Sequence, residues 1–266
     1  MTINNFEDLT SEYLREIAPK ALVIIPVGSV EQHGPHLPVG SDSFNVQQLA
    51  LKAVEKMKNK LVLVTPPLWF GSSHHHLQYS GTISLRGKTL LSVLCDIGNS
   101  LATGGFKKLF FLNGHGGNGY IIREAARELV NEHNNDLIIG GASYWEIANE
   151  ALSKVDVPKM PGHAGTFETS LQLARDEKLV DHDAKITLEN GSYSTSQYHT
   201  VSEQERAILR FQTLRGRAFF QRFDSFRKFG GVSDAPINAS SKLGQEIIDI
   251  VVDELAQFFS DFLRHP

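Results

Sequence analysis

The sequence predicts an α/β fold in which a mostly parallel sheet carries helices on both faces. Over the first two-thirds of the chain, short apolar runs alternate with longer segments whose apolar residues recur every three or four positions. This alternation is typical of parallel strands joined by crossover helices. The first run, 21–27, reads ALVIIPV without a polar residue, as expected for a strand buried on both faces.

The next elements follow in chain order. Ser41, Asp42 and Ser43 are candidate N-caps for the first helical pattern, and Gly104 and Gly105 end the second. Further strands are predicted at 61–64, 109–112 and 137–139, and helices at 43–58, 89–102 and 120–133.

The last third of the chain has a weaker pattern. A short helix is predicted at 166–175, and apolar residues on one stripe predict a long closing helix at 239–263. One or two strands are expected near Ile186 and Tyr193. The segment 206–228 is rich in Arg and Phe and shows no clear period.

Composition restricts the class of protein. The 266 residues are 41% hydrophobic and 21% charged, as in a globular protein that buries a core. No linker is visible, so we expect a single domain over 1–266. The net charge of -4 disfavours nucleic-acid binding, and no apolar run approaches the roughly 20 residues of a membrane span. The segment 1–13 lacks a signal-peptide pattern and Cys95 is the single cysteine, so we expect a cytoplasmic protein.

Histidines gather where the predicted strands end. Polar, glycine-rich segments follow the strands at 28–42, 71–82 and 113–119, and SYWE follows at 143–146. In a parallel sheet these strand ends lie along one edge, where ligands bind. We therefore expect the segments to converge on one site. Seven of the 11 histidines lie in four short loops, namely His33, His36, His74, His75, His76, His115 and His163.

Glu31 and His33 are two positions apart and would share one face of an extended chain. With Asp42 and His115 they form a set of nitrogen and oxygen ligands that suits zinc, manganese or iron. These carboxylates exceed the need of one ion, which favours two ions bridged by Asp42 that activate water and polarise a carbonyl. The alternative is a tight loop in which these side chains only bond to one another.

The segment 113–119 also fits a second interpretation. Gly114, Gly116 and Gly119 match the dinucleotide fingerprint, after a strand and before a helix, which indicates a nucleotide-dependent oxidoreductase. The acid expected at the end of the next strand is missing, and His115 would lie where a pyrophosphate must approach. Alternatively, the glycines let His115 turn inward toward a metal.

The segment 161–170 reads PGHAGTFETS. Glu168 is either a residue that stabilises the start of a helix or a metal ligand. His163 is either a loop residue or a proton donor to a leaving amine. The adjacent histidines at 74–76 cannot all face one ion, so at most two enter the site. Trp145 has core packing as its default role and a wall for a flat substrate as its alternative.

Taken together, these motifs resemble the creatininase family of creatinine amidohydrolases and their relatives. The resemblance rests on IPVGSVEQHGPHLPVGSD at 25–42, GTISL at 81–85, NGHGGN at 113–118 and HAGTFETS at 163–170. GVSDAPINASSKLG at 231–244 also resembles the family pattern. The motifs occur in family order, and the resemblance covers most of the chain.

The resemblance implies a three-layer α/β/α sandwich and two divalent ions per chain, zinc with manganese or iron as options. It implies hydrolysis of a non-peptide C–N bond, typically in a cyclic amide, by attack of a metal-bound hydroxide. Asp42 would bridge the ions, Glu168 would be a further ligand and catalytic residue, and His163 would move the proton. Family members are commonly hexamers, so a homo-oligomer is expected. The remaining implied ligands are Glu31, His33 and His115, and the predicted substrate contacts are His76, Trp145, Gly116 and Gly117.

The sequence departs from creatininase itself at three positions. Gly117 stands where creatininase has a liganding Glu, Gly162 where it has an acid, and Ser80 where the family usually has Pro. Without these acids, creatinine is not the expected substrate. Other members act on other cyclic amides, on formamides and on a small peptide precursor. A third possibility, a catalytically inactive binding subunit, is disfavoured because the ligand set is retained.

Overall fold

A computed structural model describes residues 4–59, 61–133, 137–154, 161–184, 231–232, 236 and 238–265. Within this part of the chain, parallel strands form a sheet in the order β2-β1-β3-β4. The prediction of a parallel sheet is confirmed. The strands are β1 (Leu22–Val27), β2 (Val62–Val64), β3 (Lys108–Asn113) and β4 (Ile138–Ser143).

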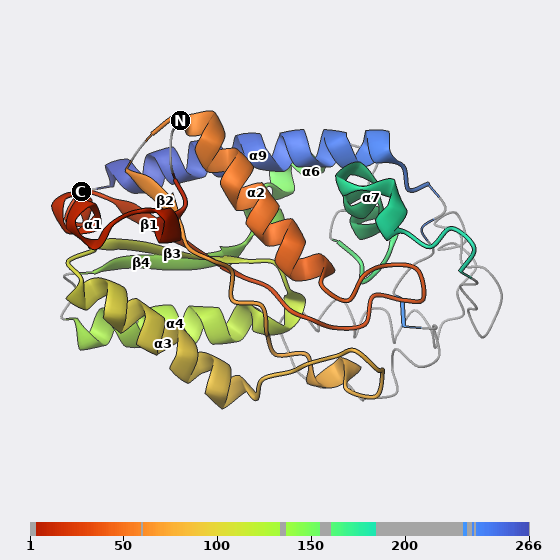
Figure 1. The fold of residues 1–266 in the computed structure, drawn as a ribbon, viewed down its shortest axis with the longest axis horizontal. Helices are drawn as coiled ribbons and strands as arrows, with labels where there is room; N and C mark the ends of the chain where they lie inside the picture. The colour runs from red at the N-terminus through yellow and green to blue at the C-terminus, as the bar shows by residue number, and fades with distance from the viewer. Residues whose placement is uncertain are drawn as a thin grey trace.

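Helices cover both faces of this sheet, which confirms the three layers (Figure 1). Helices α2 (Ser41–Met57) and α9 (Ser241–Arg264) cover one face, and α3 (Gly87–Thr103) and α4 (Gly119–Glu132) cover the other. Helix α7 (Thr166–Arg175) packs on α9. The shorter helices are η1 (Phe6–Asp8), α1 (Ser11–Ile17), η2 (His74–His76), η3 (Gly116–Asn118), α5 (Tyr144–Ile147), α6 (Asn149–Leu152) and η4 (Glu177–Leu179).

The apolar run of β1 supplies both cores. Leu22 and Ile24 lie in the cluster beneath α2 and α9, whereas Val23, Ile25 and Val27 lie in the cluster beneath α3 and α4. All five side chains are buried. Successive side chains of a strand point to opposite faces, so a strand between two helical layers needs no polar residue.

Strand β4 extends beyond the predicted 137–139. The prediction stopped early because Gly140 and Gly141 interrupt the apolar run on which it relied. A Cβ at Gly141 would lie 2.3 Å from Ile122 of α4, and one at Gly140 would lie 3.1 Å from the Phe110 ring. The strand therefore needs small residues where the apolar pattern expects large ones.

The start of α2 also differs from the prediction. The helix begins at Ser41, two residues before the predicted 43–58, and its N-cap is Gly40. Ser41, Asp42 and Ser43 are therefore not caps but lie in the first turn. The Ser43 hydroxyl donates to Ser29 and Trp69 carbonyls at 3.0 Å, which joins the helix to the loops after β1 and β2.

The other predicted helices and strands that fall on described residues agree with the structure within a few residues, whereas α1, α5 and α6 were not predicted. The closing helix α9 starts from Ser240, whose hydroxyl accepts from the Leu243 N–H at 3.1 Å. No described helix combines the length and apolar character needed to cross a membrane. The strands expected near 186 and 193, and the segment 206–228, lie outside the described residues.

Candidate metal centre

The site lies at the carboxyl ends of β1 and β3, where chain connections diverge. The helix after β1 covers one face of the sheet and the helix after β3 covers the other. Parallel sheets bind ligands at such points. The loop after β1 brings Glu31 and His33, α2 brings Asp42, the loop after β3 brings His115, and α7 brings Glu168. All five side chains are buried.

Asp42 faces a different imidazole with each of its carboxylate oxygens. Its Oδ1 lies 3.2 Å from His33 Nε2, and its Oδ2 lies 3.0 Å from His115 Nδ1. Oδ2 is buried and accepts no hydrogen bond, an arrangement that is costly unless a cation is near.

Each of the two imidazoles that face Asp42 also faces a second carboxylate. Glu31 Oε1 lies 3.3 Å from His115 Nδ1, and Glu168 Oε2 lies 3.6 Å from His33 Nε2. Ligand atoms held about 2.0–2.1 Å from a tetrahedral zinc ion lie about 3.4 Å apart. The observed spacings leave room for an ion shared between these atoms, and Glu31, His33 and Asp42 also offer ligand atoms that lie within 4.8 Å of one another.

Hydrogen bonds outside the centre fix the imidazole tautomers. His33 Nδ1–H donates to the Glu31 carbonyl at 3.0 Å, and His115 Nε2–H donates to the Ser72 carbonyl at 3.2 Å. In the neutral form of each ring, the nitrogen that faces Asp42 therefore carries a lone pair. A lone pair opposed to a carboxylate requires a proton or a metal cation between them, and outer hydrogen bonds of this kind are typical of histidine ligands.

The electrostatics of His33 and His115 agree with this reading. Burial opposes a charge on either ring, yet Asp42, Glu168 and Glu31 raise the pKa of His33 to about 10. The pKa of His115 also lies well above its usual value, because Glu31 and Asp42 outweigh burial. Both rings would hold a proton where an ion could lie instead, so the residues present fit a divalent metal.

Glu168 is placed at both positions that the sequence left open, at the start of a helix and beside a candidate metal ligand. Its Oε2 accepts from the Ala164 N–H at 2.6 Å at the start of α7 and also faces His33. Burial, opposed by His33, raises the pKa of Glu168 to about 7. Ala164 itself has a positive φ of 53°, a conformation that is uncommon for alanine and is held here by the Glu168 bond.

No side chain fits at Gly117. A Cβ there would lie 2.2 Å from the Ser72 carbonyl oxygen and 2.5 Å from His115 Nε2. The position that is a liganding Glu in creatininase is thus closed here, and Glu168 approaches His33 instead. Gly116 is exposed, with open space around its Cβ position.

His76 and His163 flank the remaining side of Glu31. His76 Nε2 and His163 Nδ1 each lie 3.4 Å from Glu31 Oε1. His75 stacks on His115 with a ring separation of 5.7 Å, whereas His74 lies within hydrogen-bond distance of the Ser84 hydroxyl. His75 and His76 therefore lie beside the candidate ligands, whereas His74 turns toward Ser84.

The other predicted contacts are less central. Trp145 is half-buried and packs edge-on against Tyr144 with a ring separation of 4.8 Å. Its place against a substrate remains a prediction.

Sequence reasoning missed Gln32, which contacts both His76 and His163. The sequence feature that could have identified Gln32 is its position between two predicted metal ligands, Glu31 and His33.

The glycine loop serves packing rather than a pyrophosphate. A Cβ at Gly114 would lie 2.6 Å from Val46 of α2, so this glycine allows the loop to approach the helix. The carboxylates of Glu31 and Asp42 face His115 of this loop and would repel a dinucleotide. The oxidoreductase alternative has no support here or among the similar proteins.

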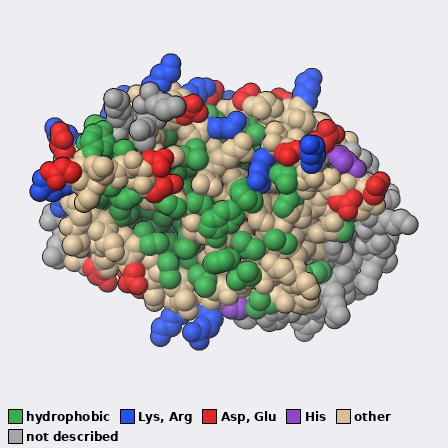
Figure 2. Space-filling view, viewed as in Figure 1, with side chains coloured by type: hydrophobic (Ala, Val, Ile, Leu, Met, Phe, Trp, Pro, Cys, Tyr) green, Lys and Arg blue, Asp and Glu red, His purple; other side chains and the backbone are tan. Residues whose placement is uncertain are grey.

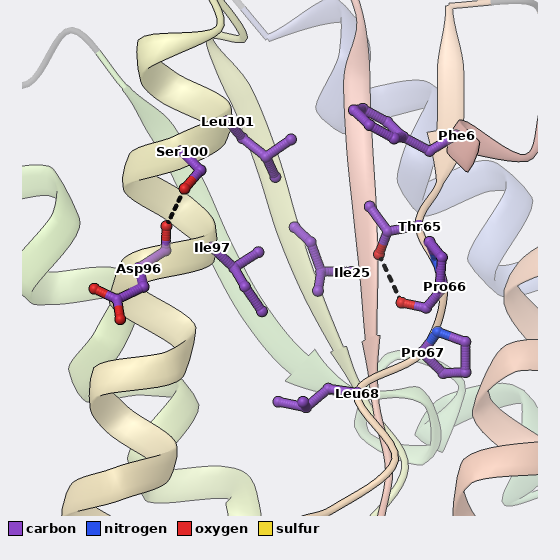
Figure 3. Close-up of a pocket in the computed structure, with 10 residues that line it drawn as sticks. All are labelled: Phe6, Ile25, Thr65, Pro66, Pro67, Leu68, Asp96, Ile97, Ser100 and Leu101. Atoms are coloured by element: carbon purple, nitrogen blue, oxygen red, sulfur yellow. Dashed lines mark hydrogen bonds between the residues drawn. The ribbon is translucent and has the colours of Figure 1, made fainter. Parts of the chain in front are cut away.

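A separate apolar groove of about 440 Å³ lies between α3 and the segment 65–68. Ile97 and Leu101 of α3 point into it, opposite Phe6 (Figure 3). Figure 2 shows hydrophobic side chains gathered near the middle of the face seen in Figure 1. The groove contains none of the histidines that converge at the metal centre.

Comparison with known proteins points to one family. The family model described as "Creatininase: Creatinine amidohydrolase" matches residues 7–259. A mycofactocin precursor peptide peptidase from Mycolicibacterium smegmatis is 33% identical over 177 residues, which cover 65% of each chain. A creatinine amidohydrolase from Pseudomonas putida is 32% identical over 187 residues, covering 65% of this chain and 71% of the other. The chain spans 60% and 65% of the first two mycofactocin precursor peptide peptidases that it matches.

Solved structures share the fold. A structure described as "Creatininase Mn" is 24% identical with a TM-score of 0.75 and covers 99% of this chain and 100% of that one. A putative creatinine amidohydrolase from Bacteroides fragilis is 23% identical with a TM-score of 0.75, over 100% and 98% of the two chains. The three-layer α/β fold is therefore that of these proteins.

Proposed function

The chain belongs to the creatininase family, and on this premise we propose that it is a divalent-metal-dependent amidohydrolase. Its substrate would be a cyclic amide or a related small amide with a non-peptide C–N bond. The observation that carries the proposal is Asp42, whose two buried oxygens face two separate ligand sets. Glu31 and His115 complete one set, and His33 and Glu168 complete the other.

We propose that each set holds one ion, with zinc preferred and manganese or iron as options. A solved mutant creatininase is described as of Zn-Zn type, and another structure as containing Mn. Bound ions of this kind lower the pKa of water and polarise a carbonyl group. The protein contributes buried ligands with fixed tautomers, so little rearrangement is needed when the ions bind.

His163 is placed to move a proton at the edge of this centre. Its Nε2–H donates to the Gln32 carbonyl at 2.7 Å, which leaves a lone pair on Nδ1 toward Glu31. Burial and the neighbouring His33 hold the pKa of His163 well below its usual value. The ring is therefore neutral near pH 7. A proton taken up at Nδ1 during the reaction would be held weakly and released readily to a leaving nitrogen. Its side chain is 13% exposed, so a substrate can reach it.

We place the substrate beside His76, Trp145, Gly116 and Gly117. Gly116 leaves open space, and Gly117 and Gly162 lack the acids of creatininase, so creatinine is not the expected substrate. A peptide amide is the main competing substrate, because relatives include mycofactocin precursor peptide peptidases. A screen of cyclic amides, formamides and short peptides separates these classes.

We also propose a homo-oligomer, with a hexamer as the form expected from the family, working in the cytoplasm. Val39, Phe70, Leu77 and Ile83 are exposed hydrophobic side chains on the loops after β1 and β2. Surface apolar groups of this kind are common where subunits meet. Light scattering on the purified protein measures the number of subunits.

Elemental analysis of protein purified without chelator tests the metal proposal. We expect two ions per chain in the wild type and loss of both in Asp42→Ala, because both sets share Asp42. Asp249→Ala removes an exposed carboxylate of α9 and should keep both ions. A wild type that takes up no ion from added zinc or manganese would show the proposal to be wrong.

A further inference from the structure

Gln32 joins three separate segments of the chain around the metal centre. It lies between Glu31 and His33, and its side chain is buried at 5% exposure. The amide contacts the backbone of Gly34, the rings of His76 and His163 and the backbone of Gly231. No part of the hydrolytic scheme above uses this side chain.

Two backbone contacts fix the orientation of the amide. Gln32 Oε1 accepts from the Gly34 N–H at 2.8 Å, and Nε2 donates to the Gly231 carbonyl at 2.9 Å. A backbone N–H only donates and a carbonyl only accepts. Reversing the amide would therefore oppose donor to donor and acceptor to acceptor.

The fixed amide determines the tautomer of His76. Gln32 Nε2 lies 2.8 Å from His76 Nδ1. The amide has two N–H groups, and one donates to the Gly231 carbonyl. His163 Nε2 also lies 2.9 Å from Gln32 Nε2, but it gives its own proton to the Gln32 backbone carbonyl and so cannot accept. The second amide proton is therefore directed to His76 Nδ1, and the neutral His76 ring carries its proton on Nε2. That nitrogen lies 3.4 Å from Glu31 Oε1, so the donors run in one direction from Gln32 through His76 to Glu31.

The amide has little freedom to adjust. Gly231 has a φ of +83°, and a Cβ there would lie 2.4 Å from Gln32 Oε1. On the other side, a Cβ at Gly34 would lie 2.6 Å from Val232, which is fully buried. Gly231 therefore packs closely against the Gln32 amide, and Gly34 packs closely against Val232, the residue that follows Gly231.

We propose that Gln32 is a positioning residue that holds His76 in the Nε2–H tautomer and so orients the Glu31 carboxylate. The backbone carbonyl of Gln32 also accepts from His163 Nε2–H. The same residue therefore fixes the tautomer of His163, whose unprotonated Nδ1 faces Glu31 from the other side. His76 presents a proton to that carboxylate and His163 presents a lone pair. The purpose of this arrangement rests on the proposed metal centre, but the tautomers can be measured without metal or substrate.

Nitrogen NMR of the full-length protein labelled with ¹⁵N-histidine tests the proposal at pH 8. One-bond and two-bond couplings distinguish Nδ1–H from Nε2–H, and a His76→Asn variant assigns the signal. We expect Nε2–H for His76 in the wild type. In Gln32→Glu the new side chain only accepts, so His76 should change to Nδ1–H. In Gln32→Met, which neither donates nor accepts through nitrogen or oxygen, both tautomers should appear.

A matched control is Gln257→Glu, which makes the same charge change on an exposed part of α9 and should leave the His76 signal unchanged. Zinc affinity of Gln32→Glu should fall roughly 10- to 100-fold, as is usual when an outer partner of a ligand is lost. A wild-type His76 that carries Nδ1–H overturns the proposal even if neither variant folds. So does an unchanged Nε2–H signal in Gln32→Glu. A wild type without metal would contradict the proposed function and leave the tautomer result standing.

Discussion

Gly244 of α9 packs directly against the backbone carbonyl of Ser170 in α7. A Cβ added at Gly244 would lie 1.9 Å from that oxygen. The Ser240 N–H also donates to the Ser170 hydroxyl at 3.2 Å. These two contacts fix α7 on the helix that covers the sheet, and α7 carries Glu168 into the metal centre.

Replacing Gly244 by alanine should therefore destabilise the protein. We expect Gly244→Ala to lower the free energy of unfolding by about 1–3 kcal/mol through overpacking, although alanine favours helices by about 1 kcal/mol. Gly119→Ala at the start of α4 is the control, because a Cβ there meets nothing within 4 Å. Urea denaturation measures both variants, and equal stability of Gly244→Ala and wild type would contradict the contact.

Glu168→Gln should remove one ion and leave the other. The amide keeps an oxygen to accept from the Ala164 N–H, so the start of α7 should survive, but the charge opposite His33 is lost. We expect metal content to fall from two ions to about one per chain, with unchanged circular dichroism. Retention of two ions in Glu168→Gln would remove Glu168 from the ligand set.

Gly117→Glu should not restore the ligand of creatininase. The new Cβ would meet the Ser72 carbonyl and the ring of His115, so the loop after β3 must move and His115 with it. We expect lower metal content and lower thermal stability than in the wild type. Gly116→Glu provides the comparison, because the adjacent position is open. A Gly117→Glu variant that binds metal more tightly than the wild type would contradict the crowding at this position.

Cys95 should be unreactive in the folded protein. Burial, together with a hydrogen bond from its thiol to Glu128 at 3.4 Å, raises the pKa of Cys95 to about 11. A raised pKa favours the neutral thiol, so at pH 8 only about a thousandth would be the reactive thiolate. We expect slow reaction with a disulfide reagent at pH 8 and rapid reaction after unfolding in guanidinium. Glu128→Gln should speed the reaction of the folded protein, and an equally slow variant would exclude Glu128 as a cause.

Much of the fold could be predicted because its pattern is local. The run at 21–27 is apolar throughout since β1 lies between two helical layers, and the period of 239–263 reflects one face of α9 against the sheet. Only the first part of strand β4 was predicted. The contacts that require glycine at 140 and 141 come from Phe110 and Ile122, which are distant in the sequence and leave no local apolar pattern. The N-caps expected at 41–43 were wrong for a similar reason, since Ser43 bonds to distant carbonyls.

The candidate site was predictable to the extent that strand order brings segments together. Parallel strands placed the segments around Glu31 and His115 at one edge, and their side chains do meet there. The contacts of Gln32 with His76 and Gly231 join positions far apart in the chain, and no local spacing encodes them. The space for a side chain at position 117 is filled by the Ser72 carbonyl of another loop. The sequence therefore showed that the Glu of creatininase is absent, but not that a side chain would not fit there.

The arrangement of His33 and Glu168 has a consequence for how the chain is held together. A protein with one cysteine cannot link distant segments through an internal disulfide. An ion held by the loop after β1 and by α7 would be a reversible cross-link between those segments, closing a long loop in the folded state alone. An ion that binds only the folded chain stabilises it by an amount set by the ion's affinity and its free concentration. Chelation would then act on this protein as reduction acts on a disulfide-linked one, loosening α7 before the sheet.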